Sequence, residues 1–235
     1  GAKSALALTF MRGGAVESPI SLSSEESQAM TLLGGDIGKV RAALNSLDGS
    51  MIIKSLSDGV TYWSFKHPTI RDAFASLISQ DPELLDIYLA GTPMHTLLNE
   101  ISCGKLGIAG SRVIVPVSRY GSVIARILPL KKNSDLGWSI NWFLSARCDK
   151  EFLAAFLSAA PSFIDSLQVY SYLYAVSDVD VLARLCEFGL LPEIKRLEVV
   201  EKIRVLAVQT PDAGFLHHDL DPLLTEAERF SILAD

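Results

Sequence analysis

His67 is the residue of this sequence whose type and position are best suited to chemistry. Residues 62–67 alternate between two faces, as a strand does, and from Ile70 the apolar residues take helical spacing. Pro68 stands between the two patterns and suits the first turn of a helix, where no amide donor is lost. An imidazole at this junction can face a phosphate or a neighbouring domain, or it can be satisfied by a backbone carbonyl.

The segment 34–40, Gly-Gly-Asp-Ile-Gly-Lys-Val, comes closest to a phosphate-binding loop. A Walker A motif requires a glycine where Leu33 stands and a serine or threonine where Val40 stands. Without that hydroxyl the loop lacks a magnesium ligand, and it lies between two predicted helices rather than after a strand. The pattern predicts no P-loop, and therefore no cofactor held by this chain.

The remaining candidates for catalysis or metal binding are weaker. His217, His218 and Asp219 have the right types for a metal site, but adjacent histidines do not easily meet one ion. We interpret them as a solvated loop before Pro222 and predict no metal site. His95 is interpreted as a core or edge residue of an apolar helix. The sequence has no Gly-x-Ser-x-Gly elbow, so it predicts a chain that is not itself an enzyme.

Charge is unevenly distributed along the 235 residues, whose net value is −6. Residues 101–134 carry no acid, whereas residues 135–235 carry 16 acids and 8 bases. Arg112, Arg119 and Arg126 recur every seven positions in the basic window. They are interpreted as a solubilising face or as ion-pair partners of the acidic C-terminal part; the functional alternative is contact with a phosphate or an acidic partner. An acidic chain argues against general nucleic-acid binding.

Composition limits the class of protein further. Apolar residues make up 49% of the chain, yet no apolar run reaches the length that spans a bilayer, so no membrane partner is expected. Three cysteines lie far apart without a Cys-x-x-Cys pair, which favours buried thiols and a cytoplasmic location. Because the sequence begins at Gly1 rather than methionine, we expect a piece of a larger protein.

Turn residues and periodicity predict a mainly α-helical chain in three parts. Residues 1–80 form a winged-helix-type domain, residues 81–134 a helical connector with a short strand and the basic window, and residues 135–235 an α-helical array. In the first part the predicted order is helix, extended piece, helix, helix and β-hairpin. The hairpin is the wing, and it turns at Ser57-Asp58-Gly59. The predicted segments there are helices 2–12, 23–33 and 36–47, an extended piece 15–20, and strands 51–56 and 60–66.

Beyond the hairpin the predicted elements are mostly helices. The ends of these helices are marked by Asp81 as a cap, by Thr92-Pro93, and by Gly189 with Pro192. The predicted elements are helices 69–80, 81–91, 92–101, 118–128, 138–147, 150–159, 178–188, 193–208 and 225–233, and a strand over 112–117. The short helices suggest an array packed as pairs; no fixed repeat period is present, so the sequence leaves a regular solenoid open.

The run Phe65-x-His67-Pro68, followed by Asp72 and Phe74, resembles a motif in the winged-helix region of bacterial NACHT-like STAND ATPases. Asp72 stands one place earlier than the acid of that family. The resemblance covers about a dozen residues. It implies that His67 senses the phosphates of ADP bound by an upstream nucleotide-binding domain of the same protein, and that Phe65, Pro68, Asp72 and Phe74 support the motif.

The resemblance implies a non-catalytic regulatory region of a signalling switch, such as an antiviral defence ATPase. ATP or ADP with magnesium would be bound by the parent protein, outside this chain. A protein trigger would act on the helical region, and the parent would oligomerise on activation. The alternative is a winged-helix DNA-binding transcriptional regulator with a helical dimerisation or ligand domain. A third hypothesis is a helical adaptor that makes no phosphate contact.

Overall fold

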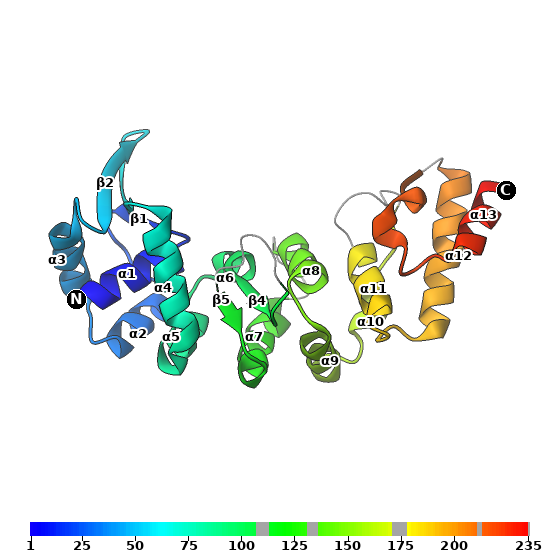
Figure 1. Ribbon diagram of the computed structural model, residues 1–235, viewed down its shortest axis with the longest axis horizontal. Helices are drawn as coiled ribbons and strands as arrows, with labels where there is room; N and C mark the ends of the chain where they lie inside the picture. The colour runs from blue at the N-terminus through cyan, green and yellow to red at the C-terminus, as the bar shows by residue number, and fades with distance from the viewer. Residues whose placement is uncertain (107–112, 131–135, 171–177, 211–212, 235) are drawn as a thin grey trace. The chain divides into compact units, whose positions relative to one another are not determined.

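The computed structural model describes residues 1–106, 113–130, 136–170, 178–210 and 213–234 (Figure 1). These residues are mainly helical, as predicted, with two small sheets. Packing divides the chain into two compact units. The first comprises Gly1–Ser102 with the described part of Gly107–Val123, and the second comprises Cys103–Leu106 and the described part of Ile124–Asp235. The predicted functional boundaries near residues 80 and 134 remain predictions.

The first unit begins with three helices and three strands in the predicted order. The elements are α1 (Ala2–Met11), β1 (Ala15–Ser18), α2 (Ser24–Leu32), α3 (Ile37–Leu47), β2 (Ile52–Ser57) and β3 (Val60–Phe65). The strands form an antiparallel sheet in the order β1-β3-β2, so β1 adds to the outer side of the β2–β3 hairpin. In this register Trp63 pairs with both Val16 and Lys54. Figure 1 shows the hairpin projecting beyond the helices of its unit.

Local chemistry explains these boundaries. Ser23 and Glu26 form the predicted capping box at the start of α2, and Asp36 accepts a hydrogen bond from the Lys39 amide at the start of α3. Asp58 and Gly59 both have positive φ, 50° and 78°, which suits a two-residue hairpin turn.

The next elements of the chain are α4 (Pro68–Gln80), α5 (Pro82–Gly91), α6 (Met94–Glu100), β4 (Ile101–Cys103), β5 (Val113–Val115), η1 (Val117–Arg119) and α7 (Tyr120–Ile127). Helices α4 and α5 pack against α1, and β4 and α7 each contain residues of both units. The predicted end of α6 was wrong, because α6 ends at Glu100 and Ile101 already belongs to β4, which pairs with β5. Ile101 is fully buried there, because a short strand hides an apolar side chain as well as a helix does. The strand predicted to run to residue 117 is also shorter, since β5 ends at Val115.

The core of the first unit centres on Phe10 of α1. Its ring lies 5.7 Å from that of Phe74 and 5.3 Å from that of Tyr88, which joins α1 to α4 and α5. Gly91 allows α5 to approach α1 and α2 closely. A Cβ at this glycine would lie 2.4 Å from Cε of Met11 and 2.5 Å from Cβ of Ala29.

The second unit is built of helices. Its elements are η2 (Leu128–Leu130), α8 (Gly137–Ala146), α9 (Lys150–Ala159), α10 (Phe163–Ser166), α11 (Asp178–Glu187), α12 (Glu193–Gln209), η3 (Ala213–Leu216), η4 (His218–Leu220) and α13 (Glu226–Ala234). A chain of ring contacts runs from Phe143 of α8 through Phe152 and Phe156 of α9 to Phe163 of α10. The short helices α10, η3 and η4 were not predicted, because each is only one turn long.

Candidate functional site

His67 is the N-cap residue of α4. Its backbone is still extended, with φ −144° and ψ 143°, because it directly follows β3. Nδ1 of the imidazole accepts a hydrogen bond from the Thr69 amide at 3.3 Å and lies 2.8 Å from Oγ1 of Thr69. Pro68 occupies the first helical position, as predicted. The imidazole is therefore satisfied by a helix amide rather than by the backbone carbonyl that the sequence analysis considered.

This cap leaves the other ring nitrogen of His67 available. Because Nδ1 accepts from an amide, we assign the proton of the neutral ring to Nε2. His67 is exposed, and its Nε2 has no hydrogen-bond partner among the residues that the structure describes. An exposed N–H donor is thus held at the junction of the hairpin and α4. It can donate to an oxyanion that approaches from solvent.

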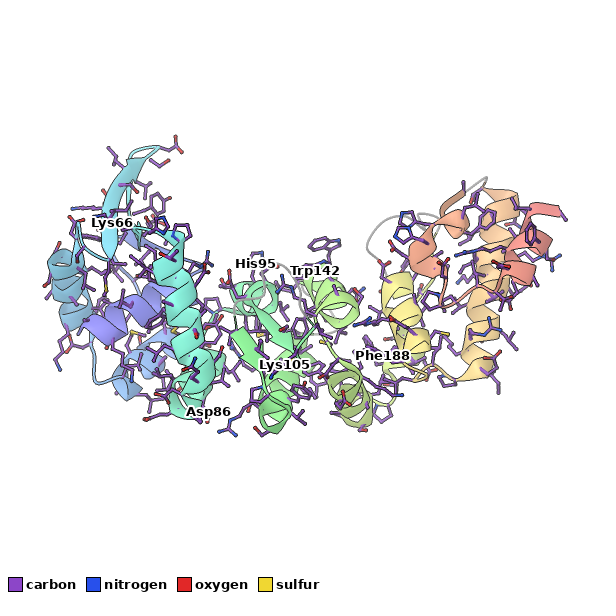
Figure 2. All side chains as sticks on the ribbon, viewed as in Figure 1. Lys66, Asp86, His95, Lys105, Trp142 and Phe188 are labelled. Atoms are coloured by element: carbon purple, nitrogen blue, oxygen red, sulfur yellow. The ribbon has the colours of Figure 1, made fainter. Side chains whose placement is uncertain are left out.

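The surroundings of His67 carry positive charge. Lys66 (labelled in Figure 2) precedes it and donates through Nζ to the carbonyl of Gly49 at the base of the hairpin. The first turn of α4 contains no acid, so the partial positive charge of the helix N-terminus is not offset there. Asp72 is exposed one turn further along α4. An anion would meet a positive local field beside His67.

The other four residues of the motif lie in β3 and α4. Phe74 is buried against Phe10, and Phe65 pairs with Ile52 at the end of the hairpin. Pro68 and Asp72 are exposed in α4. Phe65 and Phe74 anchor the two ends of the segment, and this fixes where the His67 side chain emerges.

The three spaced arginines do not share one role. Arg112 lies outside the described residues. Arg119 makes a two-pronged ion pair with Asp86 of α5, at 2.5 and 3.0 Å (Asp86 is labelled in Figure 2). This partner comes from the same unit, and not from the acidic C-terminal part that the sequence suggested. Arg126 is half-buried and belongs to the second unit.

The glycine-rich segment 34–40 serves to end one helix and begin another. Gly34 has a positive φ of 70° after α2, and Asp36 caps α3. Lys39 lies 3.7 Å from the Asp36 carboxylate and 3.4 Å from the Gly34 carbonyl. As predicted, the segment connects two helices and does not follow a buried strand.

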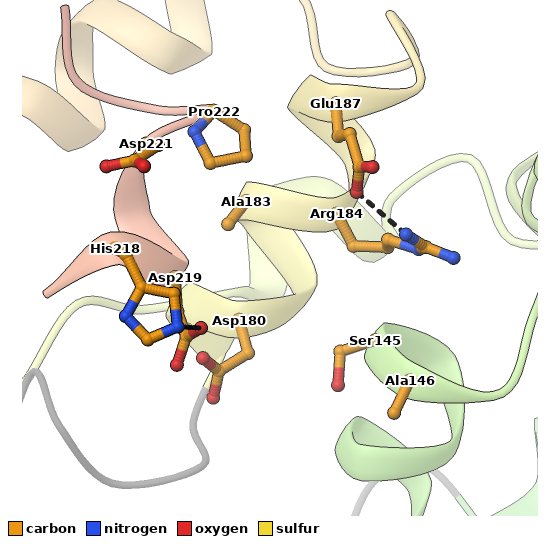
Figure 3. A pocket seen from close by; sticks show the side chains of 10 residues that line it. All are labelled: Ser145, Ala146, Asp180, Ala183, Arg184, Glu187, His218, Asp219, Asp221 and Pro222. Atoms are coloured by element: carbon orange, nitrogen blue, oxygen red, sulfur yellow. Dashed lines mark hydrogen bonds and ion pairs between the residues drawn. The ribbon is translucent and has the colours of Figure 1, made fainter. Parts of the chain in front are cut away.

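An open pocket of about 440 Å³ lies within the second unit (Figure 3). Its lining residues are Ser145, Ala146, Asp180, Ala183, Arg184, Glu187, His218, Asp219, Asp221 and Pro222. Four carboxylates thus face two basic side chains. Arg184 pairs with Glu187 at 2.7 Å and lies over the ring of Phe188 at 4.2 Å, so its charge is already engaged. Since Glu187 pairs with Arg184 and Asp221 with Arg229, Asp180 and Asp219 are the carboxylates through which the pocket favours a cation over an anion.

His217, His218 and Asp219 form a compact cluster at this pocket. Nδ1 of His217 lies 3.0 Å from Oδ2 of Asp219, and Nε2 of His218 lies 3.2 Å from Oδ1 of the same carboxylate. The two imidazole centroids are 4.5 Å apart. From the sequence, adjacent histidines were expected not to meet one ion easily. They converge because the one-turn helix η4 directs different ring nitrogens, Nδ1 and Nε2, towards one carboxylate.

Two thiols that the sequence places 45 positions apart are neighbours in the second unit. Cys103 and Cys148 face each other across a parallel β-bridge, and both are fully buried. Burial, together with the Cys103 thiol beside it, holds the pKa of Cys148 well above its ordinary value. Spacing alone gave no signal of this pair, because the bridge depends on how β4 meets the segment after α8.

Comparison with protein-family models, with curated proteins and with solved structures found no match to this chain. In the part of the chain that the structure describes, no helix is both long enough and apolar enough to cross a bilayer.

Proposed function

We propose that this chain is a non-catalytic regulatory region of a STAND-type ATPase switch, and that His67 contacts the phosphates of ADP. The observation that carries the proposal is the exposed Nε2–H of His67, which has no hydrogen-bond partner among the described residues and lies beside Lys66 and the N-terminus of α4. Its neutral tautomer is fixed by the Thr69 amide, so the donor needs no proton uptake to bind an anion. ADP and its magnesium are held by an upstream nucleotide-binding domain of the same protein.

The arrangement of residues 1–80 supports a winged-helix assignment. Three helices, a strand β1 between the first two, and a hairpin in the order β1-β3-β2 form one packed group with α4 behind it. In this assignment the hairpin is the wing, and His67 sits at its base on the outgoing strand. An upstream domain that docks against this base brings its bound nucleotide to the imidazole.

The free energy of a hydrogen bond between His67 and ADP is large enough to shift the equilibrium of a switch. A hydrogen bond to a charged group contributes about 1.5 to 3 kcal/mol, which corresponds to roughly a 10- to 150-fold change in an equilibrium constant. His67 therefore stabilises the closed state while ADP is present and adds nothing once ADP leaves. A protein trigger that binds the helical second unit must favour the open state by a comparable free energy. Oligomerisation, a cytoplasmic location and a role in antiviral defence belong to the same proposal.

The structure offers less support for the alternative, a DNA-binding regulator. A winged-helix DNA reader needs a basic recognition helix, which α3 would supply here. On α3 the basic residues are Lys39 and Arg41, and Lys39 already pairs with Asp36. This leaves Arg41 to neutralise phosphates, which is weak for a DNA-binding surface.

The test starts from the full open reading frame that contains this sequence. We expect a Walker A motif in frame upstream, after a predicted strand and before a helix. We also expect ADP to copurify with the full-length protein, and His67→Ala to lower the bound ADP. His95→Ala is the matched control, because His95 is also an exposed histidine of the first unit. A reading frame without the motif, or equal ADP in both variants, contradicts the proposal.

A further inference from the structure

The cluster of His217, His218 and Asp219 has the donor types that zinc and related ions prefer. Imidazole nitrogen and carboxylate oxygen both bind Zn²⁺ at about 2.0 to 2.2 Å. Donor atoms around a tetrahedral ion of that size lie about 3.3 Å from one another. The two nitrogen–oxygen distances, 3.0 Å from His217 to Oδ2 and 3.2 Å from His218 to Oδ1 of Asp219, are each close to this spacing. One donor atom from each of the three residues lies within 4.8 Å of the others.

The turn that carries the cluster is held in place by contacts independent of the cluster. Leu220, directly after Asp219, is buried with 1% of its surface exposed. Arg229 of α13 spans the turn, since it pairs with the Asp221 carboxylate at 2.5 Å and donates to the His217 carbonyl at 3.1 Å. The backbone of the turn therefore needs little ordering when an ion binds, which favours binding.

The cluster also faces an electrostatic environment that suits a cation. His218 and Asp219 line the acidic pocket together with Asp180 and Asp221, and Figure 3 shows Asp180 beside them at one end of it. Two neutral imidazoles and one carboxylate leave a bound Zn²⁺ with one net positive charge. The neighbouring Asp180 carboxylate stabilises that charge, whereas Asp221 is paired with Arg229. The open pocket leaves the fourth position to water or to an acidic side chain of a partner.

We propose that His217, His218 and Asp219 form a binding site for a divalent transition-metal ion of the zinc type, with its open coordination position facing the pocket. This site lies in the second unit and does not depend on the role of His67. His217 contributes Nδ1, His218 contributes Nε2 and Asp219 contributes one carboxylate oxygen. Zinc binds the lone pair of a neutral imidazole, so each ring then carries its proton on the nitrogen that faces away from the ion, Nε2 of His217 and Nδ1 of His218.

The experiment is a calorimetric titration of the tag-free 235-residue chain with zinc chloride in a buffer that does not bind metals. The expected result is one zinc per chain. His218→Ala should weaken binding by about 10-fold or more, since it removes a direct ligand. The side chain of His218 is 79% exposed, so this variant should fold normally, as its circular dichroism will show. His95→Ala is the control for loss of an exposed histidine outside the cluster and should bind like the wild type.

A second measurement distinguishes coordination of the ion by these side chains from non-specific binding. Cobalt(II) replaces zinc, and its visible absorption reports nitrogen and oxygen ligands around the ion. The double variant His217→Ala/His218→Ala should lose this absorption, and a chelator should remove it from the wild type. The proposal is overturned if the wild type binds no stoichiometric zinc. It is also overturned if the double variant binds zinc with the same affinity as the wild type.

Discussion

The amide of Thr69 donates to Nδ1 of His67, so one imidazole both caps α4 and presents its second nitrogen to solvent. The two roles can be separated by mutation. His67→Ala removes the cap acceptor and the exposed donor together. His67→Ser keeps a cap acceptor but cannot reach as far as Nε2 does.

We expect His67→Ala to lower the free energy of unfolding by about 0.5 to 2 kcal/mol, because the start of α4 loses its cap. His67→Ser should recover most of this loss. Urea denaturation of the 235-residue chain, followed by circular dichroism, measures both variants. If alanine and serine destabilise the chain equally, the cap does not contribute to stability.

Gly91→Ala should destabilise the chain by about 1 to 3 kcal/mol, because the added methyl overpacks the contact between α5, α1 and α2. Gly121→Ala is the matched control, since a Cβ there meets no atom of the described residues within 4 Å. Gly121 lies in α7, where alanine should be neutral or stabilising. Thermal unfolding of the two variants side by side checks this. Equal melting temperatures would show that the close approach at Gly91 is not required.

Most of the helices and strands could be predicted because particular capping and turn residues mark their ends. Ser23, Asp36 and Asp81 cap helices where predicted, and Asp58-Gly59 turns the hairpin. Prediction failed where the signal is tertiary. Ile101 fits a helix or a strand equally well, and only pairing with β5 decides between them.

In the candidate sites, too, local features could be predicted from the sequence and tertiary contacts could not. The position of His67 between strand and helix was visible in the sequence, but its cap to Thr69 depends on the side-chain geometry of the turn. Arg119 was interpreted as part of a solubilising face, as an ion-pair partner of the C-terminal acids, or as a contact for a phosphate or an acidic partner. It pairs with Asp86, 33 residues before it in the chain. The approach of His217 and His218 to one carboxylate could not be predicted. It depends on His217 using Nδ1 and His218 using Nε2, which the sequence does not determine.

Stability should fall in acid through the pair of Glu26 and Arg12. Burial opposes ionisation of Glu26, but hydrogen bonds from Arg12 and the Ser23 amide outweigh it and hold its pKa below the usual 4.5. A group with a lowered folded pKa contributes stability above its unfolded pKa and loses it as pH falls through the folded value. Glu26→Gln should therefore cost about 2 kcal/mol near neutral pH and little in strong acid. Urea denaturation across this pH range measures the difference, and a constant cost would contradict it.

The three thiols should react at different rates. Cys103 and Cys148 are fully buried, whereas Cys186 is half-buried, and burial raises the pKa of the Cys186 thiol. A disulfide reagent should therefore label Cys186 slowly in the folded chain and all three cysteines in denaturant. Cys186→Ser should remove the reaction of the folded chain. Rapid labelling of Cys103 or Cys148 without denaturant would show that the β-bridge between them opens readily.

The central proposal is that Nε2 of His67 holds ADP in the closed state. The most direct measurement is the rate at which the full-length protein releases a fluorescent ADP analogue, compared between wild type and His67→Ser. Serine keeps the cap, so we expect a normally folded protein that releases ADP about 10- to 100-fold faster. An unchanged release rate in a folded His67→Ser protein would contradict the account and leave His67 with its capping role alone.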